Sequence, residues 1–504
     1  MAHIGKEFDR VSIGVTALTV ILLAAAMAPL FVVEIPAMLD YPNHLARMYL
    51  LSGPPNPAYE LHWGPYPDLA MDLVVPALAH WVGVATAAKT FLGLSQILVV
   101  AGAIFLELTV KGRHRLGGPG ALLVLFSLPF AWGQMNFMFG MGLAAWGVAL
   151  WIRLRNRPAW IRWSVHAATV ASLFISHLFD LGVYGLVIGS YELSRLGKPT
   201  KTSSLFKLAI FMASPALAML AATWLADGQH EQLGALDWDF GLKLGWAAIF
   251  MNVYDTPLSM LTAAALLFVV LVLVVARRMS LTREGIWIAG GLLAAYVALP
   301  RQISGSQYLD VRLLTAAALI LPAFINTPLP SGLWRAAPLT VVIAIIAANE
   351  ATSARAWFDY ERDYTEFRKS FAQLTAGSAV LIGQRDQAGR DFQPVFYAAT
   401  LAAPFAGVFV SSLYAHPGAQ PLQPRTRYQE LAVKAEPECY PPRLAALRAA
   451  IRGSASAGTQ ANLVNWPARY RYLYLLGARG PNPLPATLTL LAVGRRFSLY
   501  RIVR

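Results

Sequence analysis

The stretch VSIGVTALTVILLAAAMAPLFVVEIPAMLDYPNHLAR, residues 11–47, decides the fold of this chain. Its first part, residues 11–33, is a largely apolar run long enough for a helix to cross the hydrocarbon core of a membrane. Lys6 and Arg10 precede this run, and no small-residue cleavage motif lies near its end. We therefore expect an uncleaved first span with a cytoplasmic N-terminus, since basic residues stay on the inner side.

The polar segment DYPNHLAR, residues 40–47, follows this first span. Asp40, His44 and Arg47 recur at i, i+4 and i+7, so a helix would carry all three on one face. An acid, an imidazole and a guanidinium at a membrane boundary are costly unless they have a function. The pattern predicts a reaction site at the outer membrane surface. The alternative is that Asp40, followed by Pro42, caps the N-terminus of a helix.

The composition of the whole chain is that of a polytopic membrane protein. Of its 504 residues, 57% are hydrophobic and only 13% are charged, and the mean hydropathy is +0.50. Much of the net charge of +14 lies in short basic loops between apolar runs, as the positive-inside rule predicts, so it does not indicate nucleic acid. The single cysteine, Cys439, excludes an intramolecular disulfide and a cysteine-based metal cage.

Charge counting along the chain predicts about 11 transmembrane helices within residues 1–350. The first outer loop, 34–87, contains a proline-rich stretch, and its apolar segment 68–84 is short and polar for a span, so we expect a juxtamembrane helix there. The segment 244–254 is expected at the interface. After the first span, the expected spans lie near residues 88–110, 119–132, 136–152, 161–177, 180–194, 207–225, 257–276, 285–300, 313–327 and 336–350.

On this topology, polar side chains near the ends of spans converge on the outer face of the membrane. Ionisable residues within a membrane are functional candidates by default, and several that converge predict a site. The inner face has basic loops but no comparable mixture of acids, histidines and amides. The candidate site residues are Asp40, His44, Arg47, Gln134, Asn136, His177, Asp180, Arg301, Asp310 and Arg312.

Two of the turns that carry these candidates also have a purely structural interpretation. Gln134 and Asn136 stand in a tight turn between two spans, where amide side chains often cap helix ends. His177 and Asp180, in a second turn, could form a local pair that holds two helices together. The residues alone leave both interpretations open beside the functional one.

The segment RQISGSQYLDVR, residues 301–312, is the candidate with the clearest chemistry. Arg301 and Arg312 flank a Gly-Ser-Gln turn, and arginine suits bidentate contact with phosphate. The alternative is an ion pair between Arg312 and Asp310 that anchors the end of a span. In the functional interpretation, the segment would hold an anionic group at the outer interface.

The order of these features resembles the GT-C superfamily of glycosyltransferases. Four motifs carry the resemblance: DYPNHLAR (40–47), WGQMNFMFGMGL (132–143), SHLFDLG (176–182) and YLDVRLL (308–314). The closing FSLYRIVR (497–504) is similar to the last strand of many such proteins. Members include protein O-mannosyltransferases and lipid A aminoarabinose transferases, which take a sugar from a polyprenyl-phosphate or polyprenyl-diphosphate donor at the outer face of the membrane.

The resemblance implies an inverting glycosyltransferase that forms no covalent intermediate. The family's first-loop acid, carried onto Asp40, would be the catalytic base or the group that orients the acceptor, and His44 or His177 would also orient the acceptor. Arg301 and Arg312, together with Arg47, would hold the leaving phosphate. The family's first loop usually has two acids, whereas Asp40 stands alone, so a paired-acid motif for a divalent cation is not present.

The C-terminal part, residues 351–504, alternates strand-like and helical patterns. It predicts an extracytoplasmic α/β domain over the outer face, following the transmembrane GT-C-like domain of residues 1–350. The loop 414–429 either overhangs the site or lies on the surface. We expect strands near 378–383, 405–412, 470–477 and 488–494 and a helix near 443–453.

The sequence therefore predicts a multi-pass enzyme of the bacterial inner membrane whose site and C-terminal domain face the periplasm. Its expected partners are a polyprenyl-phosphate sugar donor, the lipid bilayer and a glycan, lipid or protein acceptor, with no nucleic acid and no certain cofactor. Two other classes stay open. One is a transporter or flippase of lipid-linked sugars, which would have broken helices in paired halves. The other is a non-catalytic assembly protein that keeps the fold.

Overall fold

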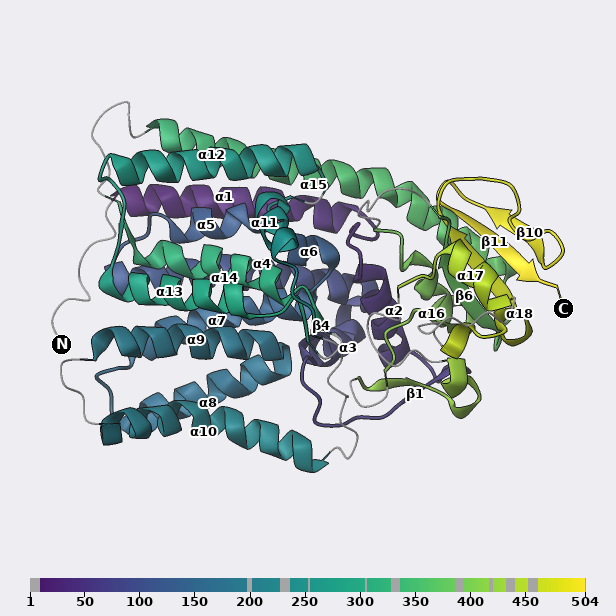
Figure 1. Cartoon of the computed structure of the whole chain (residues 1–504), viewed down its shortest axis with the longest axis horizontal. Helices are drawn as coiled ribbons and strands as arrows, with labels where there is room; N and C mark the ends of the chain where they lie inside the picture. The colour runs from purple at the N-terminus through teal and green to yellow at the C-terminus, as the bar shows by residue number, and fades with distance from the viewer. Residues whose placement is uncertain are drawn as a thin grey trace.

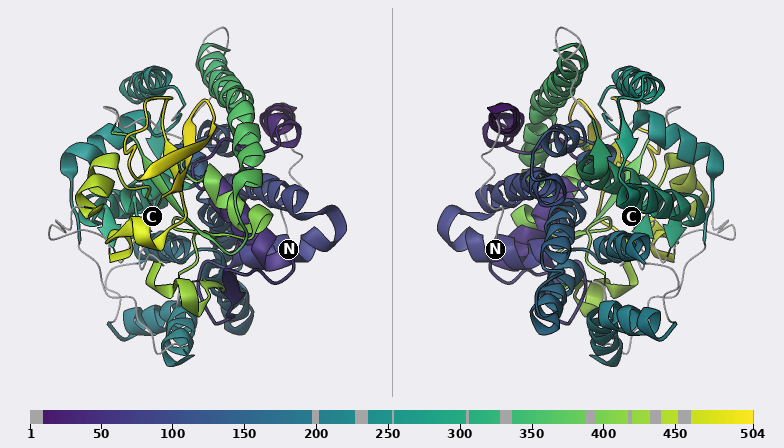
Figure 2. Two further views of the ribbon diagram at one scale, coloured as in Figure 1. Left: turned by 90° about the vertical axis from the view of Figure 1, so that its right-hand side faces the viewer. Right: turned by 90° about the vertical axis from the view of Figure 1, so that its left-hand side faces the viewer.

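The computed structural model describes residues 10–196, 202–226, 236–252, 254–303, 306–327, 336–386, 394–416, 420–431, 440–451 and 461–503. Cys439 and two residues of the predicted phosphate-binding turn, Ser304 and Gly305, lie outside these ranges. Long helices run along the length of the molecule, and a sheet with its own helices closes one end (Figure 1). Figure 2 shows the molecule end-on, with the C-terminal elements in front of the helices in its left panel.

The bundle is built from helices that are joined mostly by short turns. Within the described residues, five of them, namely α1, α4, α7, α12 and α15, are long and apolar enough to cross a membrane. The bundle helices are α1 (Arg10–Val32), α4 (Val84–Lys111), α5 (Gly117–Leu123), α6 (Leu128–Trp132), α7 (Met135–Arg153), α8 (Ala159–Ser176), α9 (Leu178–Arg195), α10 (Thr202–Ala226), α11 (Phe240–Ile249), α12 (Thr256–Val275), α13 (Arg283–Ala298), α14 (Leu309–Ile320) and α15 (Ala336–Ser370).

The outer surface of the bundle has the apolar character that contact with lipid requires. In the most apolar stretch of α12, only 11% of the residues are buried. Leu267 and Phe268 on this helix are 60% and 67% exposed. A soluble protein rarely exposes so continuous an apolar face, whereas a membrane helix must. The chain is thus a polytopic helical membrane protein, as the composition predicted. The number of spans stays a prediction.

Most of the expected spans coincide with a helix, but three of them differ in extent. The α-helix of the expected span 313–327 ends at Ile320, and a 3-10 turn and the strand β5 (Ile325–Asn326) follow it. The expected span 119–132 is two short helices, α5 and α6. Residues 124–127 leave the helix, and Pro129 stands in the first turn of α6, where its missing N–H costs nothing. The expected span 336–350 continues in α15 as far as Ser370. The position expected to separate the two domains therefore lies inside one helix.

Two short helices follow the first span, and both bear on the site. α2 (Tyr41–Ser52) carries DYPNHLAR and lies between the bundle and the C-terminal sheet (Figure 1). α3 (Ala70–Val82) occupies the segment expected to be juxtamembrane and packs against α4. Gly83, with φ 76°, separates α3 from α4, and glycine adopts this left-handed conformation without steric cost. α3 is therefore a helix separate from α4, and its juxtamembrane position stays a prediction.

A five-stranded mixed sheet, in the order β10-β11-β9-β6-β7, forms the C-terminal end. Parallel pairs join β6 to β7 and β9, whereas β11 is antiparallel to β9 and β10. α15 covers one face, where the rings of Phe367 and Phe497 lie 4.1 Å apart. On the other face, Leu447 of α17 lies against Gly383. The strands and this helix are β6 (Ala379–Gln384), β7 (Phe409–Val410), β9 (Tyr472–Leu476), β10 (Leu488–Val493), β11 (Phe497–Ile502) and α17 (Leu444–Ile451).

A second, two-stranded sheet ties the first outer loop to the C-terminal region. β1 (Tyr59–Leu61) pairs antiparallel with β8 (Leu422–Pro424). The Tyr59 hydroxyl also accepts a hydrogen bond from the N–H of Val410, 351 residues away in the chain. These bonds hold the C-terminal elements beside α2. The remaining elements are β2 (Ser280–Leu281), β3 (Gln302–Ile303), β4 (Ser306–Gln307), β5 (Ile325–Asn326), α16 (Ala402–Ala406), α18 (Trp466–Arg469) and the short 3-10 turns at 321–324, 371–373, 398–401, 426–431 and 461–463.

Candidate active site

Asp40 stands at the start of α2 and contacts the C-terminal region. Its side chain makes no capping hydrogen bond to α2; instead, Oδ1 accepts a hydrogen bond of 3.0 Å from the Tyr414 hydroxyl. Asn43 positions Tyr414, because its Nδ2 donates to the Ser412 carbonyl at 2.7 Å and its Oδ1 accepts from the Tyr414 N–H at 2.8 Å. Asp40 thus occupies the N-cap position that the alternative predicted, but its side chain caps no backbone N–H of α2. The loop that begins at Tyr414 reaches the predicted site.

His44 and Arg47, on the same helix, have different surroundings. The His44 ring lies edge-on to the Tyr414 ring with 5.7 Å between centroids, and its Nδ1 is buried without a hydrogen-bond partner among the described residues. Burial, with a smaller contribution from the Arg47 charge, lowers the pKa of His44 well below its ordinary value, so the ring is neutral. The Arg47 guanidinium donates to Asp72 of α3 at 2.9 Å, and both side chains are buried. A phosphate contact for Arg47 stays a prediction.

Arg312, in the first turn of α14, is the centre of a second polar group. Its side chain is almost fully buried. Nε donates to Oε1 of Gln134 at 3.1 Å, and Nη1 lies 3.3 Å from Nε2 of His177. The rings of Phe137 and Phe179 each lie 5.7 Å from the guanidinium carbon. These contacts hold the guanidinium in a buried position, where charged groups interact more strongly than they would in water.

Asp68, which the sequence did not indicate, lies in this second group. Its Oδ1 accepts the N–H of Leu178 at 2.8 Å, at the N-terminus of α9, and its Oδ2 lies 3.9 Å from Nε2 of His177. The Asp68 backbone has φ 63°, a left-handed conformation that is uncommon outside glycine and often occurs at functional sites. The nearby Arg312 charge also acts on this carboxylate.

The electrostatic surroundings of Asp68 differ from those of a surface acid. The surrounding protein excludes water and raises the pKa of Asp68 to about 6, while the Leu178 hydrogen bond and the Arg312 charge lower it. Because 43% of the side chain remains accessible, water that reaches it lessens the increase. The carboxyl group therefore changes its charge closer to neutral pH than an ordinary aspartate does.

The two amides of the turn between α6 and α7, Asn136 and Gln134, have different roles. Asn136 donates from Nδ2 to the Asp68 carbonyl at 2.5 Å and accepts from the Met71 N–H at 2.9 Å, in the first turn of α3. This agrees with the helix-end role that was the alternative for Asn136. Gln134, by contrast, makes its side-chain contact with Arg312. The first of these amides therefore holds the Asp68 loop, and the second holds the guanidinium.

Asp180 is fully buried near the start of α9, and neither of its carboxyl oxygens has a hydrogen-bond partner among the described residues. The predicted local pair with His177 is not formed, because the His177 ring faces Arg312 and Asp68. A side chain at Gly140 of α7 would collide with the Asp180 carboxyl group. Glycine at that position thus makes room for a buried acid close to Arg312.

Arg301 and Asp310 bind partners that the sequence did not indicate. Nη1 of Arg301 lies 3.6 Å from Oδ2 of Asp237, at the partly exposed edge of the site. Asp310 is buried, and its Oδ2 lies 3.5 Å from Nζ of Lys243 on α11. The predicted alternative, an ion pair between Asp310 and Arg312, is therefore wrong. The two residues are two apart on α14, so their side chains leave the helix in different directions.

The turn between α6 and α7 connects the Asp40 group with the Arg312 group. The Asp40 N–H donates to the Trp132 carbonyl at 2.9 Å, and Gln134, two residues further on, contacts Arg312. Gly133 between them has φ 90°, and a Cβ there would lie 3.0 Å from the Asp40 Cβ and backbone N. The close approach and the left-handed backbone both require glycine. Residues far apart in the sequence are thus neighbours at one site.

Aromatic rings bring Arg301 into the same region. Its guanidinium lies over the Tyr308 ring, 5.2 Å from the centroid. The Tyr308 ring lies 4.1 Å from that of Trp132 and 5.6 Å from that of Trp246. Tyr308 has φ 59°, a conformation that is unusual for a bulky side chain and costs energy. Tyr308 thus contacts both the Arg301 guanidinium and Trp132, the residue whose carbonyl binds the Asp40 N–H.

The site as built contains acids, guanidinium groups and neutral imidazoles, but no cluster of metal ligands. Within the described part of the chain, no group of three or more His, Cys, Asp or Glu side chains could hold a metal ion. Sequence reasoning missed Asn43, Asp68 and Tyr414. The acidic and proline-rich surroundings of Asp68 were a usable signal. For Tyr414 the sequence gave only the alternative that the loop 414–429 overhangs the site, because long-range contacts bring this residue to Asp40.

Comparison with known proteins finds similarity to solved structures. No protein-family model matches the sequence, and no curated protein matches it. The chain is similar to crystal structures of ArnT from Cupriavidus metallidurans in the apo state and bound to undecaprenyl phosphate. Both are 13% identical to this chain, and the similarity covers 97% of this chain and 98% of ArnT, with TM-scores of 0.48 and 0.49. ArnT belongs to the superfamily that the sequence motifs resemble.

Proposed function

We propose that this chain is a membrane glycosyltransferase that moves a sugar from a polyprenyl-phosphate donor to an acceptor at the outer face of the cytoplasmic membrane. The observation that carries the proposal is the setting of Arg312. Its guanidinium is buried, bound by Gln134, in contact with the His177 ring, and accompanied by the accessible carboxylate of Asp68. A fixed guanidinium among apolar helices suits the phosphate of a lipid whose tail lies in the membrane.

In this proposal Arg312 binds the donor phosphate and stabilises the charge that develops on it as the glycosidic bond breaks. The bond between the sugar carbon and the phosphate oxygen breaks, and a bond from the acceptor oxygen to the same carbon forms on the opposite face. The configuration is therefore inverted. The lipid phosphate leaves with the electron pair, and the proton of the acceptor passes to a carboxylate of the site.

Asp40 is the group to which we assign that proton. Its Oδ1 accepts from the Tyr414 hydroxyl, which holds the carboxylate in one orientation. His44 beside it is neutral and has a buried nitrogen with no hydrogen-bond partner among the described residues, so it can orient an acceptor hydroxyl. The acceptor itself, a glycan, lipid or protein, and the orientation of the site toward the periplasm remain parts of the proposal.

Asp68 and His177 have a supporting role in the same scheme. His177 Nδ1 accepts the N–H of Phe179 at 3.2 Å, so the proton of the neutral ring is assigned to Nε2, which lies 3.9 Å from Oδ2 of Asp68. An ionised Asp68 attracts this N–H and thereby fixes the ring beside Arg312. The pair positions the phosphate-binding guanidinium and does not take part in bond making.

The experiment that tests the proposal is donor turnover by the purified chain in lipid nanodiscs. A polyprenyl-phosphate sugar with a radiolabelled sugar is supplied with a membrane extract as acceptor, and release of polyprenyl phosphate is followed. Arg312→Gln should reduce turnover by at least about a hundredfold, and Arg312→Lys by less, because it keeps the charge but loses the bond to Gln134.

The matched control is Arg278→Gln, which removes an exposed guanidinium just beyond α12 and should leave turnover unchanged. A folded Arg312→Gln variant with the wild-type rate would contradict the proposal. Movement of the intact donor across the bilayer, with no new glycosidic bond, would instead identify a transporter.

A further inference from the structure

The C-terminal sheet has parallel strands whose carboxyl ends lie at one edge. β6 and β9 run parallel and end together, where Gln384 pairs with Leu476. β7 is parallel to β6 on its other side, so the chain passes from β6 to β7 and then back across β6 to β9. In open α/β sheets, ligands bind outside the carboxyl ends of the strands where the strand order reverses. The carboxyl ends of β6 and β9 are therefore a candidate place for a ligand.

Two arginines lie in the segments that follow these two strands. Arg385 directly follows β6, and its N–H donates to the Leu476 carbonyl at 2.9 Å. Its Nη2 donates to the carbonyls of Gly480 and Pro481 at 3.3 Å and 3.2 Å. A Cβ at Gly480 would lie 3.1 Å from Nη1 of this arginine, so the loop after β9 passes against the guanidinium. Arg479 belongs to the same loop, directly before Gly480.

A third arginine reaches the same place from α17. The Gln384 N–H, at the end of β6, donates to the Pro442 carbonyl at 2.9 Å. Arg443 follows this proline and pairs with Gln384 in a parallel β-bridge. Three segments that are distant in the sequence thus each bring a guanidinium to one side of the sheet. We call Arg385, Arg443 and Arg479 the arginine edge.

The positive charge of the arginine edge is not balanced by nearby acids. Arg443 and Arg479 are exposed, and their guanidinium groups make no hydrogen bond or ion pair with another described residue. Asp386, the one acid in the described parts of these segments, accepts the Ala445 N–H at 3.2 Å at the start of α17. Residues 351–504 contain 19 Lys and Arg but only 9 Asp and Glu. Guanidinium groups with this freedom suit bidentate contact with a carboxylate or phosphate.

A row of tyrosine rings connects the arginine edge with Asp40. Tyr414, whose hydroxyl donates to Asp40, has its ring 5.4 Å from that of Tyr397. The Tyr397 ring lies 6.4 Å from that of Tyr440, and Tyr440 stands three residues before Arg443. A molecule bound at the arginine edge would therefore lie beside the acid to which we assign the acceptor proton.

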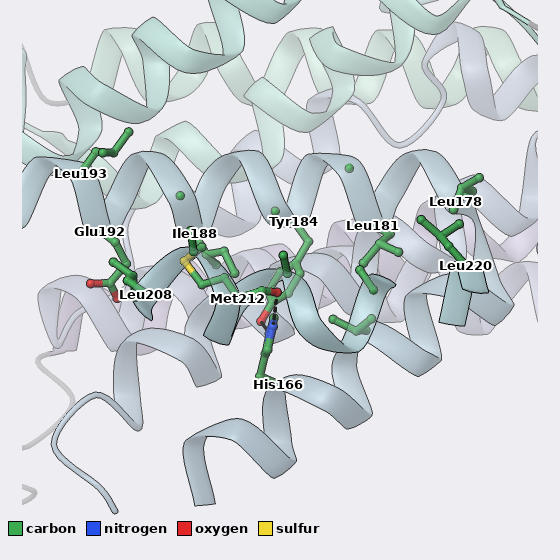
Figure 3. Close-up of a pocket in the computed structure, with 17 residues that line it drawn as sticks. His166, Leu178, Leu181, Tyr184, Ile188, Glu192, Leu193, Leu208, Met212 and Leu220 are labelled. Atoms are coloured by element: carbon green, nitrogen blue, oxygen red, sulfur yellow. Dashed lines mark hydrogen bonds between the residues drawn. The ribbon is translucent and has the colours of Figure 1, made fainter. Parts of the chain in front are cut away.

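The apolar groove along α9 offers no such partners to a polar molecule. It has a volume of about 770 Å³ and is lined by residues of α8, α9 and α10 (Figure 3). The two ring nitrogens of His166 lie 2.9 Å from the Tyr184 hydroxyl and the Met212 carbonyl, and Glu192 accepts from Arg162 at 2.5 Å. A sugar would lose its hydrogen bonds to water there without replacement. A polar acceptor thus finds partners at the arginine edge and not in this groove.

We propose that the arginine edge binds an anionic group of the acceptor and that the acceptor is an acidic glycan, an inference that rests on the proposed function. The carboxylate or phosphate of one sugar contacts Arg443 and Arg479, while the hydroxyl of another sugar reaches Asp40. In Figure 1, the sheet and α17 lie on the far side of α2 from the bundle. A glycan chain extends to this position, whereas lipid headgroups stay near the ends of the bundle helices.

The test compares two probes with the same sugar backbone: an oligosaccharide of galacturonic acid, which is anionic, and its methyl ester, which is neutral. Binding to the full-length protein in nanodiscs of neutral lipid, without donor, is measured by microscale thermophoresis. The wild-type protein should bind the acid at least about tenfold more tightly than the ester. Added salt should weaken the binding of the acid, because the arginines that contact it are exposed.

The variant that tests the arginine edge combines Arg443→Gln and Arg479→Gln in one chain. This double variant should reduce the preference for the acid to about twofold or less and leave the binding of the ester unchanged. Arg501→Gln is the matched control, since Arg501 is exposed and pairs with Tyr472 at the amino end of β9, the opposite edge of the sheet. The control should keep the wild-type preference. An unfolding temperature equal to that of the wild type shows that each variant is folded.

Equal binding of acid and ester by the wild-type protein, or a preference that persists in the double variant, would overturn the proposal. So would loss of binding to a short-chain phosphatidylglycerol in the double variant with an unchanged glycan preference, because the arginines would then contact anionic lipid. A preference that depends on the arginine edge in a chain without sugar transfer would support the site and contradict the glycosyltransferase. Sugar transfer without any preference for the acid would do the reverse.

Discussion

The Tyr414 hydroxyl donates a hydrogen bond of 3.0 Å to Oδ1 of Asp40, although 374 residues separate the two in the chain. Asn43, in the first turn of α2, makes this possible, because its amide binds the backbone on both sides of residue 413. The C-terminal region therefore completes the surroundings of the first-loop acid. In the proposed enzyme, the C-terminal region contributes a residue, Tyr414, to the active site.

Tyr414→Phe should lower turnover while leaving donor binding intact. The change removes the hydroxyl that orients the Asp40 carboxylate but keeps the ring that packs against His44. Loss of one hydrogen bond to a charged group is worth about 1.5 kcal/mol or more, so we expect kcat to fall by about tenfold with an unchanged donor Kd. Tyr364→Phe is the control, since that hydroxyl donates to the Pro394 carbonyl. A wild-type kcat in Tyr414→Phe would remove Asp40 from its assigned role.

We expect turnover to decrease at acidic pH as the Asp68 carboxylate becomes protonated. Burial raises its pKa to about 6, so the group is largely protonated below that pH and ionised above it. If the ionised form orients His177, turnover should rise with pH through about 6. This rise should be absent in Asp68→Asn. The exposed Asp359 of α15 provides the control, and Asp359→Asn should keep the wild-type profile. An unchanged inflection in Asp68→Asn would assign the limb to another group.

Asp68 also predicts a dependence of stability on pH. Its folded-state pKa of about 6 lies above the ordinary value of 3.8, so the folded protein binds this proton more tightly than the unfolded chain does. The stabilisation is complete below 3.8 and is lost as the pH rises through about 6. Asp68→Asn should therefore flatten the pH profile of the unfolding temperature and raise that temperature above pH 6, measured by thermal unfolding in detergent. A variant profile parallel to the wild type would contradict the elevated pKa.

The buried pair of Arg47 and Asp72 predicts a large cost for removing one partner. Asp72→Ala leaves the Arg47 charge buried and unpaired, which should cost about 3–5 kcal/mol of unfolding free energy in detergent. Glu34→Ala is the control, because the pair of Glu34 with Arg368 is exposed on both sides and should contribute about 0–1 kcal/mol. Similar costs for the two variants would mean that Arg47 finds another partner or water.

The sequence predicted those helices and strands whose signal lies within one continuous segment of the chain. Apolar length indicated α1 and α4, and the SHLFDLG turn marked the break at His177 between α8 and α9. The alternation of strand-like segments likewise indicated β6, β9 and β10. These features arise from hydrophobic periodicity and chain breaks within one segment, so one sequence is sufficient to find them.

The partners of the charged side chains could not be found in the same way. Arg312 contacts Gln134, 178 residues away in the chain, and Asp310 selects Lys243 on another helix. Sequence proximity suggested an Asp310–Arg312 pair, but residues two apart on a helix point in different directions. A buried charged side chain needs a polar or oppositely charged partner, but its burial does not determine which residue that partner is. Candidate polar residues could therefore be selected from the sequence, while their contacts depend on the packing of the bundle.

Gly133→Ala should reduce turnover by displacing Asp40, an effect that backbone strain alone would not produce. Gly133 has φ 90°, and a Cβ there would lie 3.0 Å from the Cβ and backbone N of Asp40. An alanine must therefore move either the turn or the acid, and a displacement of about 1 Å can reduce turnover by about a hundredfold. The turn also carries Gln134, so donor binding at Arg312 should weaken as well.

Gly112→Ala separates strain from crowding in this prediction. Gly112 ends α4 with φ 66°, but a Cβ there meets nothing within 4 Å. Both substitutions place alanine in a left-handed conformation, so both should lower the unfolding free energy by about 1 kcal/mol. Only Gly133→Ala should also lose turnover, when both variants are compared at equal amounts of folded protein. Equal turnover in the two variants would show that the contact between this glycine and Asp40 has no part in the reaction, and the acid would then need a different partner to hold its position.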